Sequence, residues 1–300
     1  MIISTIKTER QVTERYVDHR GSRIRYLVVG EGPPLVMIHG GNGSAENFDT
    51  WFDDVGTVRT LVIPDLPGFG ESQILRGRQR HSPQNLSLVI DTVIADYGAE
   101  KIDLGGLCMG ACVALAFYRR RKDDVGKLIL HTPLISPPLI LTRFRRQVSF
   151  MRAFPLYPLF VWAGRRRWIS DWYKRHFTEG EVAGDSGADV NFINQKRCSV
   201  RASREWIYDA LRSHDVDLIR ERKDPTLMLL AGEDMITNIE GVIDLARDLP
   251  RVSLAVFDDA GHGWSKDFVE RQNSVLCSFL TDQELPAGAR LREMPRVAVA

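Results

Sequence analysis

Short apolar runs alternate with amphipathic segments along most of this chain. The runs have the length of buried strands, and the segments between them carry apolar residues at helical spacing. Strands are predicted over 24–29, 34–38, 58–64, 101–105, 127–131, 225–231 and 252–257. Helices are predicted over 44–52, with Ser44 as the N-cap, and over 84–97, 111–117, 238–247 and 268–280. Strands that alternate with helices indicate an α/β fold with a mostly parallel central sheet flanked by helices.

One long segment, residues 136–222, departs from this alternation. It is helical in character and holds 16 Lys and Arg against 10 Asp and Glu, a balance of +6, together with four of the six tryptophans. It is too long for an ordinary connection between strands, so we expect a helical cap or lid inserted after the sixth strand. The core is then expected in two parts, 1–135 and 223–282, with 283–300 as a loosely held tail.

Composition excludes several classes of protein. A net charge of +1 disfavours nucleic acid as a partner, and no apolar stretch approaches the roughly 18 residues of a membrane span. The N-terminus lacks the apolar run of a signal peptide, so a cytoplasmic location is expected. The four cysteines form no C-x-x-C pair and no metal-ligand cluster with histidine. We therefore expect no metal, no cofactor and no membrane partner. The protein is expected to be a monomer or a homodimer.

The sequence Gly-Leu-Cys-Met-Gly, residues 106–110, has the pattern of a nucleophile elbow with sulfur at its centre. It lies between a predicted strand and a predicted helix, where the chain must turn tightly and side chains at Gly106 and Gly110 would meet backbone. The turn would place Cys108 at a helix N-terminus, whose partial positive charge favours a thiolate. Cys108 could instead be a buried core residue. With a histidine and an acid in register downstream, we favour a catalytic role.

Several further motifs stand in a characteristic order. They are His-Gly-Gly-Asn-Gly at 39–43, Asp-Leu-Pro-Gly-Phe-Gly-Glu-Ser at 65–72, the elbow, the insertion, Gly-Glu-Asp at 232–234 and Ala-Gly-His-Gly at 260–263. In this order the chain resembles the α/β-hydrolase superfamily over about residues 14–282. A cysteine at the elbow is shared with the dienelactone hydrolases and polyhydroxyalkanoate synthases of that superfamily.

The resemblance implies a Cys-His-Asp triad that needs no cofactor. Cys108 would be the nucleophile, His262 the base and Asp234 the acid that orients it, with Glu233 as an alternative acid because this turn is one residue short. Backbone N–H groups of Met109 and of Gly41 or Asn42 would form the oxyanion hole. The ring of His39 is expected to brace the loops around it.

A cysteine nucleophile leaves three functions open. The favoured one is cleavage of an ester, thioester or lactone through a covalent acyl-enzyme. The alternative is an acyltransferase or acyl-eliminating enzyme of secondary metabolism, because a thioester is readily opened by other nucleophiles. The third is a non-catalytic ligand-binding protein, although no member of the triad is missing.

The expected partner is a small-molecule acyl substrate, free or bound to a carrier. Trp162, Trp168, Arg165 and Trp264 are predicted substrate contacts, since a guanidinium suits a carboxylate or phosphate of the substrate or of an acidic carrier. A solvated basic face with tryptophans packed beneath it is the alternative interpretation of the cap residues.

Overall fold

An eight-stranded sheet forms the centre of the molecule in the computed structural model, which describes residues 8–151, 156–169, 172, 186–247, 249, 251–262 and 266–286. The strand order is β1-β2-β4-β3-β5-β6-β7-β8. Strands β1, β2 and β4 pair antiparallel, and all the other pairs are parallel. The strands are β1 (Val12–His19), β2 (Ser22–Val29), β3 (Pro34–Ile38), β4 (Thr60–Pro64), β5 (Ile102–Leu107), β6 (Val125–His131), β7 (Thr226–Ala231) and β8 (Val252–Phe257).

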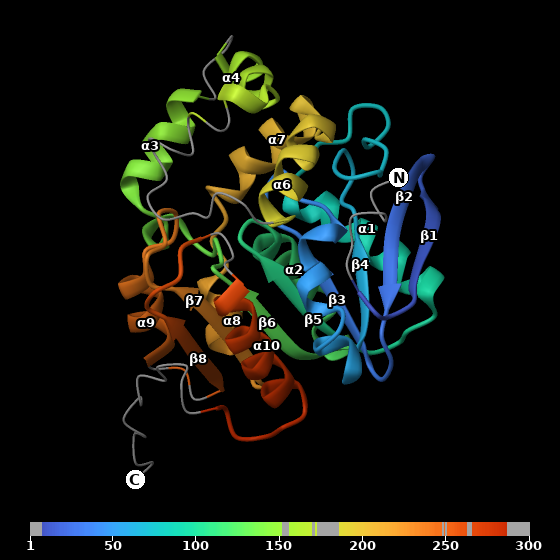
Figure 1. Ribbon diagram of the computed structural model, residues 1–300, viewed down its shortest axis with the longest axis vertical. Helices are drawn as coiled ribbons and strands as arrows, with labels where there is room; N and C mark the ends of the chain where they lie inside the picture. The colour runs from blue at the N-terminus through green and yellow to red at the C-terminus, as the bar shows by residue number, and fades with distance from the viewer. Residues whose placement is uncertain are drawn as a thin grey trace.

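Helices flank the sheet and follow its strands in sequence (Figure 1). Around the core lie α1 (Pro83–Tyr97), α2 (Gly110–Arg120), α9 (Ile239–Arg247) and α10 (Lys266–Leu280). Between β6 and β7 lie α3 (Thr142–Met151), α4 (Leu156–Gly164), α6 (Ser186–Arg197), α7 (Val200–Ala210) and α8 (Val216–Glu221). Short 3-10 helices span Ala45–Trp51, Val55–Thr57, Lys122–Asp124 and Pro137–Leu139.

The inner strands are buried because helices cover both faces of a parallel sheet. Every residue of β4 and β7 is buried, as are the last four residues of β3. These are the continuous apolar runs from which strands were expected. The predicted α/β fold with a mostly parallel sheet is confirmed.

Two local features differ from the sequence-based prediction. Strand β1 lies at the sheet edge and carries exposed polar residues such as Thr13 and Arg15, so it has no apolar run to reveal it. Residues 45–51 form a 3-10 helix in which Ala45, Phe48 and Trp51 are all buried. Their spacing of three residues matches the 3-10 period, so the tighter helix buries all three on one side.

The helices α3 to α8, here called the cap, are tied to the core by polar contacts. In Figure 1, α3, α4, α6 and α7 gather at one end of the sheet. The backbone N–H of Ser199 donates to Gly68 O at 2.7 Å, and His81 Nδ1 lies 2.7 Å from Glu205 Oε2. Within the described part of the chain, no helix combines the length and apolar character that a membrane-spanning helix needs.

Candidate active site

Cys108 lies in a turn that only glycine neighbours allow. Its backbone is left-handed, with φ at 53°, a conformation that costs a non-glycine residue about 1–3 kcal/mol. A Cβ on Gly106 would lie 2.5 Å from Ala111 N, and one on Gly110 would lie 2.6 Å from His39 O. Cys108 N donates to His131 O at 2.9 Å, which fixes the turn to the end of β6. Cys108 is 9% exposed at the junction of β5 and α2.

The loops after β7 and β8 bring Asp234 and His262 together. Asp234 Oδ2 lies 2.8 Å from His262 Nδ1, and the side chain of Asp234 is fully buried. Asp234 Oδ1 accepts hydrogen bonds from the backbone N–H groups of Ile236 at 2.6 Å and Thr237 at 2.9 Å. Glu233, the alternative acid, is exposed to solvent. Asp234 is therefore the carboxylate that orients the ring of His262.

The two charged partners of His262 determine its protonation. Burial alone would lower the pKa of His262, but the charge of Cys108, a hydrogen bond to Asp234 and a hydrogen bond to Cys108 raise the pKa well above its ordinary value. Burial would raise the pKa of Asp234, yet the hydrogen bond and charge of His262 lower it. The pKa values of His262 and Asp234 are thus coupled, and Cys108 lies close enough to contribute to that of His262.

Removing the sulfur is expected to lower the pKa of His262. In Cys108→Ala the group that contributes most to raising the pKa of His262 is gone, while the opposing effect of burial remains. The imidazolium should then lose its proton at a lower pH than in the wild type. Titration of the His262 ring resonances by NMR measures the change, with Cys112→Ala as the control. An unchanged His262 titration in Cys108→Ala would contradict the coupling.

The loop at residues 39–43 lies beside the elbow. A Cβ on Gly40 would lie 3.3 Å from the Cβ of Cys108, and a Cβ on Gly41 would lie 2.6 Å from the sulfur of Met109. Among the described residues, none accepts a hydrogen bond from the backbone N–H of Gly41, Asn42 or Met109. These are the donors that the sequence predicted for an oxyanion.

His39 supports this loop with both ring nitrogens. Nδ1 lies 2.7 Å from Gly40 O, and Nε2 accepts from the backbone N–H of Leu66 at 3.0 Å. Burial lowers the pKa of His39 to about 4, so the ring is neutral and donates through Nδ1. The ring therefore braces two loops, the role expected of it from the sequence.

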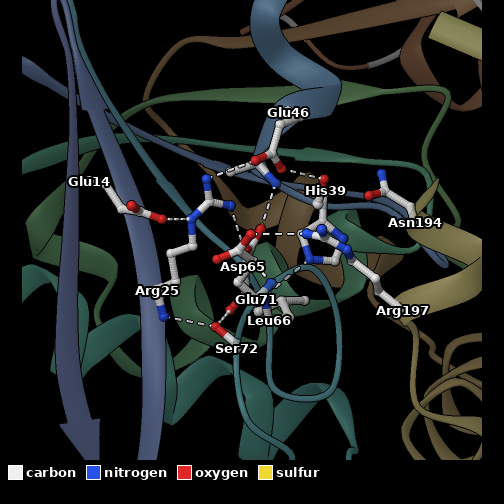
Figure 2. Close-up of polar contacts among 12 residues, drawn as sticks. Glu14, Arg25, His39, Glu46, Asp65, Leu66, Glu71, Ser72, Asn194 and Arg197 are labelled. Carbon is white, nitrogen blue, oxygen red and sulfur yellow. Dashed lines mark hydrogen bonds and ion pairs between the residues drawn. The ribbon is translucent and has the colours of Figure 1, made fainter. Parts of the chain in front are cut away.

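A buried ionic cluster lies behind the same loop (Figure 2). Arg25 contacts Glu46 at 2.7 Å and Asp65 at 2.8 Å, and all three side chains are fully buried. Asp65 also accepts from the backbone N–H groups of Ala45 at 2.7 Å and Glu71 at 2.9 Å. Burial and the charge of Glu46 raise the pKa of Asp65 to about 6, against the opposing charge of Arg25.

Arg25→Met is expected to destabilise the fold by about 3–5 kcal/mol, because it leaves two buried carboxylates without their cation. Without Arg25 the pKa of Glu46, which this cation lowers, rises above its value in the unfolded chain, and the already raised pKa of Asp65 rises further. Such carboxylates stabilise the fold at acidic pH and lose that effect as the pH rises through the folded-state pKa. The deficit should therefore be larger at pH 8 than at pH 5 in urea unfolding. The control is Arg23→Met, an exposed arginine on the same strand; equal losses in the two variants would argue against the cluster.

Three polar contacts near the site had no signal in the sequence. Ser203 on α7 donates to Asn42 Oδ1 at 2.6 Å, and Tyr157 on α4 lies 2.6 Å from the same hydroxyl. Asn42 has a left-handed backbone, with φ at 56°. His131 Nε2 lies 3.1 Å from Gln272 Oε1. Burial and the nearby charge of His262 lower the pKa of His131 to about 3, which keeps a neutral ring behind the site.

The predicted substrate contacts lie mainly on the cap. Arg165 donates to Gln195 O at 3.3 Å and to Cys198 O at 2.7 Å, so its guanidinium caps the C-terminal end of α6. Trp162 and Trp168 are exposed by 51% and 73%. Trp264 lies outside the described residues. Among the residues described, no group of three or more His, Cys, Asp or Glu could hold a metal ion.

This sheet and elbow define an α/β hydrolase. Residues 33–265 match the model of the α/β hydrolase fold, and the chain belongs to that family. Both the fold and the prediction of an α/β-hydrolase-fold enzyme are confirmed, since the curated relatives it matches are hydrolases.

The relatives are distant but cover most of the chain. 2-Hydroxymuconate semialdehyde hydrolase of Pseudomonas sp. is 24% identical over 270 residues, 86% of this chain and 90% of the relative. Lipase 1 of Psychrobacter immobilis is 23% identical over 263 residues, 81% of this chain and 75% of the relative. A solved structure of the N-acyl homoserine lactonase AidH aligns with a TM-score of 0.73 at 16% identity, covering 92% of this chain and 99% of that one. The structural likeness supports the fold.

Proposed function

We propose that the protein is a hydrolase that cleaves an ester, thioester or lactone through a covalent acyl-enzyme on Cys108. The observation that carries this proposal is the coupling of Cys108, in its left-handed turn, to a His262 that hydrogen-bonds Asp234 at 2.8 Å. A nucleophile, a base and a carboxylate that orients the base form the arrangement needed for acyl transfer to the enzyme. The hydrolase relatives support the same reaction class.

The chemistry follows from the protonation of this unit. The Cys108 thiolate attacks the substrate carbonyl, forming a C–S bond and an oxyanion that the backbone N–H groups of Gly41, Asn42 and Met109 would receive. When the carbonyl re-forms, the leaving group departs with the proton of the His262 imidazolium. Water then gives a proton to His262 and attacks the thioester carbon. The acid product leaves, and the thiolate–imidazolium pair is restored.

Transfer of the acyl group is the second candidate, and the sulfur of Cys108 is the observation that favours it. A thioester is opened by amines, thiols and activated alcohols as well as by water. An acyltransferase or an acyl-eliminating enzyme of secondary metabolism would use the same first step, with a free or carrier-bound acyl donor. The two candidates share the attack of Cys108 on the acyl donor. They differ in the next step, in which water, another nucleophile or an elimination removes the acyl group from the enzyme.

Intact-mass spectrometry after acid quenching tests the proposal. The full-length protein is mixed with a panel of activated esters, acyl thioesters, lactones and dienoate or semialdehyde compounds of the kind named for the relatives. We expect an added mass equal to the acyl group, cleavable by neutral hydroxylamine as a thioester is, and absent in Cys108→Ala. Release of free acid from the adduct in buffer supports a hydrolase, whereas release only on addition of an amine, thiol or alcohol supports a transferase. Turnover without any Cys108 adduct would overturn the covalent mechanism.

A further inference from the structure

Large apolar side chains are exposed on the face of the cap formed by α4 and residues 165–169. Leu159 is 56% exposed, Trp162 51% and Trp168 73%. Leu159 and Trp162 stand three residues apart on α4, so they project from the same side of the helix. A group of exposed large apolar residues marks an interaction surface in a soluble domain.

Cations lie over two aromatic rings of this face, Trp162 and Phe192. The guanidinium of Arg166 lies 4.9 Å from the centre of the Trp162 ring. Arg167 and Lys196 lie 5.6 Å and 5.0 Å from the centre of the Phe192 ring. These side chains border an open hollow of about 730 Å³. Among the described residues, its lining contains no acidic side chain and consists of Arg165, Arg166, Arg167, Trp168, Phe192 and Lys196.

The sequence around this face is also rich in arginine and aromatic residues. Residues 142–169 contain seven arginines, seven aromatic residues and no Asp or Glu. On α3, Arg143 and Arg146 are exposed, and Phe150 is exposed by 66%. Arginine with tryptophan, phenylalanine and leucine on short amphipathic helices is the composition of segments that lie in the surface of an anionic bilayer.

The charge on this face separates the possible occupants. A symmetric contact between two copies would set arginines against arginines, which opposes association. An acidic protein would match the charge, so it is the competing occupant that the test below must separate from lipid. Tryptophan rings favour the boundary between lipid headgroups and acyl chains, because one edge is polar and the rest is apolar.

Against the sequence-based expectation of no membrane partner, we propose that this cap face docks the protein on an anionic lipid surface. The face comprises Leu159, Trp162, Arg166, Arg167, Trp168 and Lys196. Trp162 and Trp168, predicted from the sequence as substrate contacts, would insert among the headgroups. The arginines would meet lipid phosphates or carboxylates. The described helices are too short or too polar to cross a membrane, and docking at the surface needs no such helix. The proposal stands independently of the reaction at Cys108.

Vesicle sedimentation with the full-length protein tests the docking directly, without any measurement of activity. Vesicles of phosphatidylcholine with phosphatidylglycerol should pull down the wild type, and vesicles of phosphatidylcholine alone should bind it at least about tenfold more weakly. High salt should weaken binding to the anionic vesicles. Cys108→Ala should bind as the wild type does.

Two pairs of variants separate the apolar and charged contributions. Each of two double variants should weaken binding to anionic vesicles by about tenfold or more. The first is Trp162→Ala/Trp168→Ala, and the second is Arg166→Gln/Arg167→Gln. Tyr16→Ala, an aromatic exposed by 36% on β1, is the control for the first pair. Arg220→Gln/Arg247→Gln removes two half-exposed arginines from α8 and α9 and is the charge-matched control for the second. The controls should bind as the wild type does.

Three outcomes would overturn the proposal. The first is equal binding to charged and uncharged vesicles, or to neither. The second is equal loss in the cap variants and their controls. The third is a wild type that ignores vesicles but forms a dimer, or binds an acidic acyl-carrier protein, through Arg166 and Arg167. That result would assign the face to a protein.

Discussion

Cys108→Ala is expected to lower kcat by about 10⁴- to 10⁶-fold, because removal of a covalent nucleophile leaves only binding and the backbone donors to assist the reaction. Iodoacetamide should alkylate Cys108 ahead of the other three thiols and abolish turnover. Burial raises the pKa values of Cys112, Cys198 and Cys277, so these thiols remain protonated near neutral pH. Mass mapping of the alkylated peptide and a steady-state assay on the same sample measure both effects.

Cys112→Ala is the matched control for this variant. Cys112 stands one helical turn beyond Cys108 and donates to Met109 O at 2.8 Å in the buried interior. Its removal should leave kcat and the labelling of Cys108 unchanged. Full turnover in Cys108→Ala, or loss of turnover in Cys112→Ala alone, would show that the reaction does not proceed through the elbow sulfur.

His262→Ala is expected to lower kcat nearly as much as Cys108→Ala does. Asp234→Asn is expected to lower kcat by about 10²- to 10⁴-fold. In Asp234→Asn the anion that accepts from His262 Nδ1 is replaced by an amide, so the ring loses both its orientation and part of the charge that keeps it protonated. The losses should not add in the double variant, because the two side chains act through one another. Steady-state kinetics of the single and double variants give the comparison.

Glu233→Gln provides the control for the acid. Glu233 stands beside Asp234 in the chain but is exposed, so its amide should leave kcat unchanged. If Glu233→Gln is damaging and Asp234→Asn is harmless, the orienting acid is the neighbouring residue. Additive losses in the double variant of His262 and Asp234 would show that they do not act as a unit.

Features with a local signal were predictable from the sequence. The turn at Cys108 was predictable because Gly106 and Gly110 flank it at the spacing of a nucleophile elbow. The apolar runs of the strand before it and the helix after it lie in the same short stretch. Asp234 and His262 each stand in a recognisable loop after a strand. Their pairing then follows from the fold, since the carboxyl ends of neighbouring parallel strands meet at one edge of the sheet.

Features that depend on distant partners were not predictable. Arg25, Glu46 and Asp65 are polar residues that would each be expected on the surface, and only the folded sheet brings them together in the interior. Ser203 lies 161 residues from Asn42 in the sequence. The hydrogen bonds from Arg165 to two carbonyls at the end of α6 likewise had no signal in the sequence, and its contact with substrate stays a prediction.

The contact between Ser203 and Asn42 makes the cap less modular than its place in the chain implies. An insertion between β6 and β7 could be exchanged among relatives as a cassette if it touched only the substrate. Here Ser203 of α7 holds a residue of the loop beside Cys108, and Ser199 donates to Gly68 on the core. A foreign cap would therefore change those two core loops. Chimeras of this protein therefore need Asn42 and Gly68 redesigned together with the inserted helices.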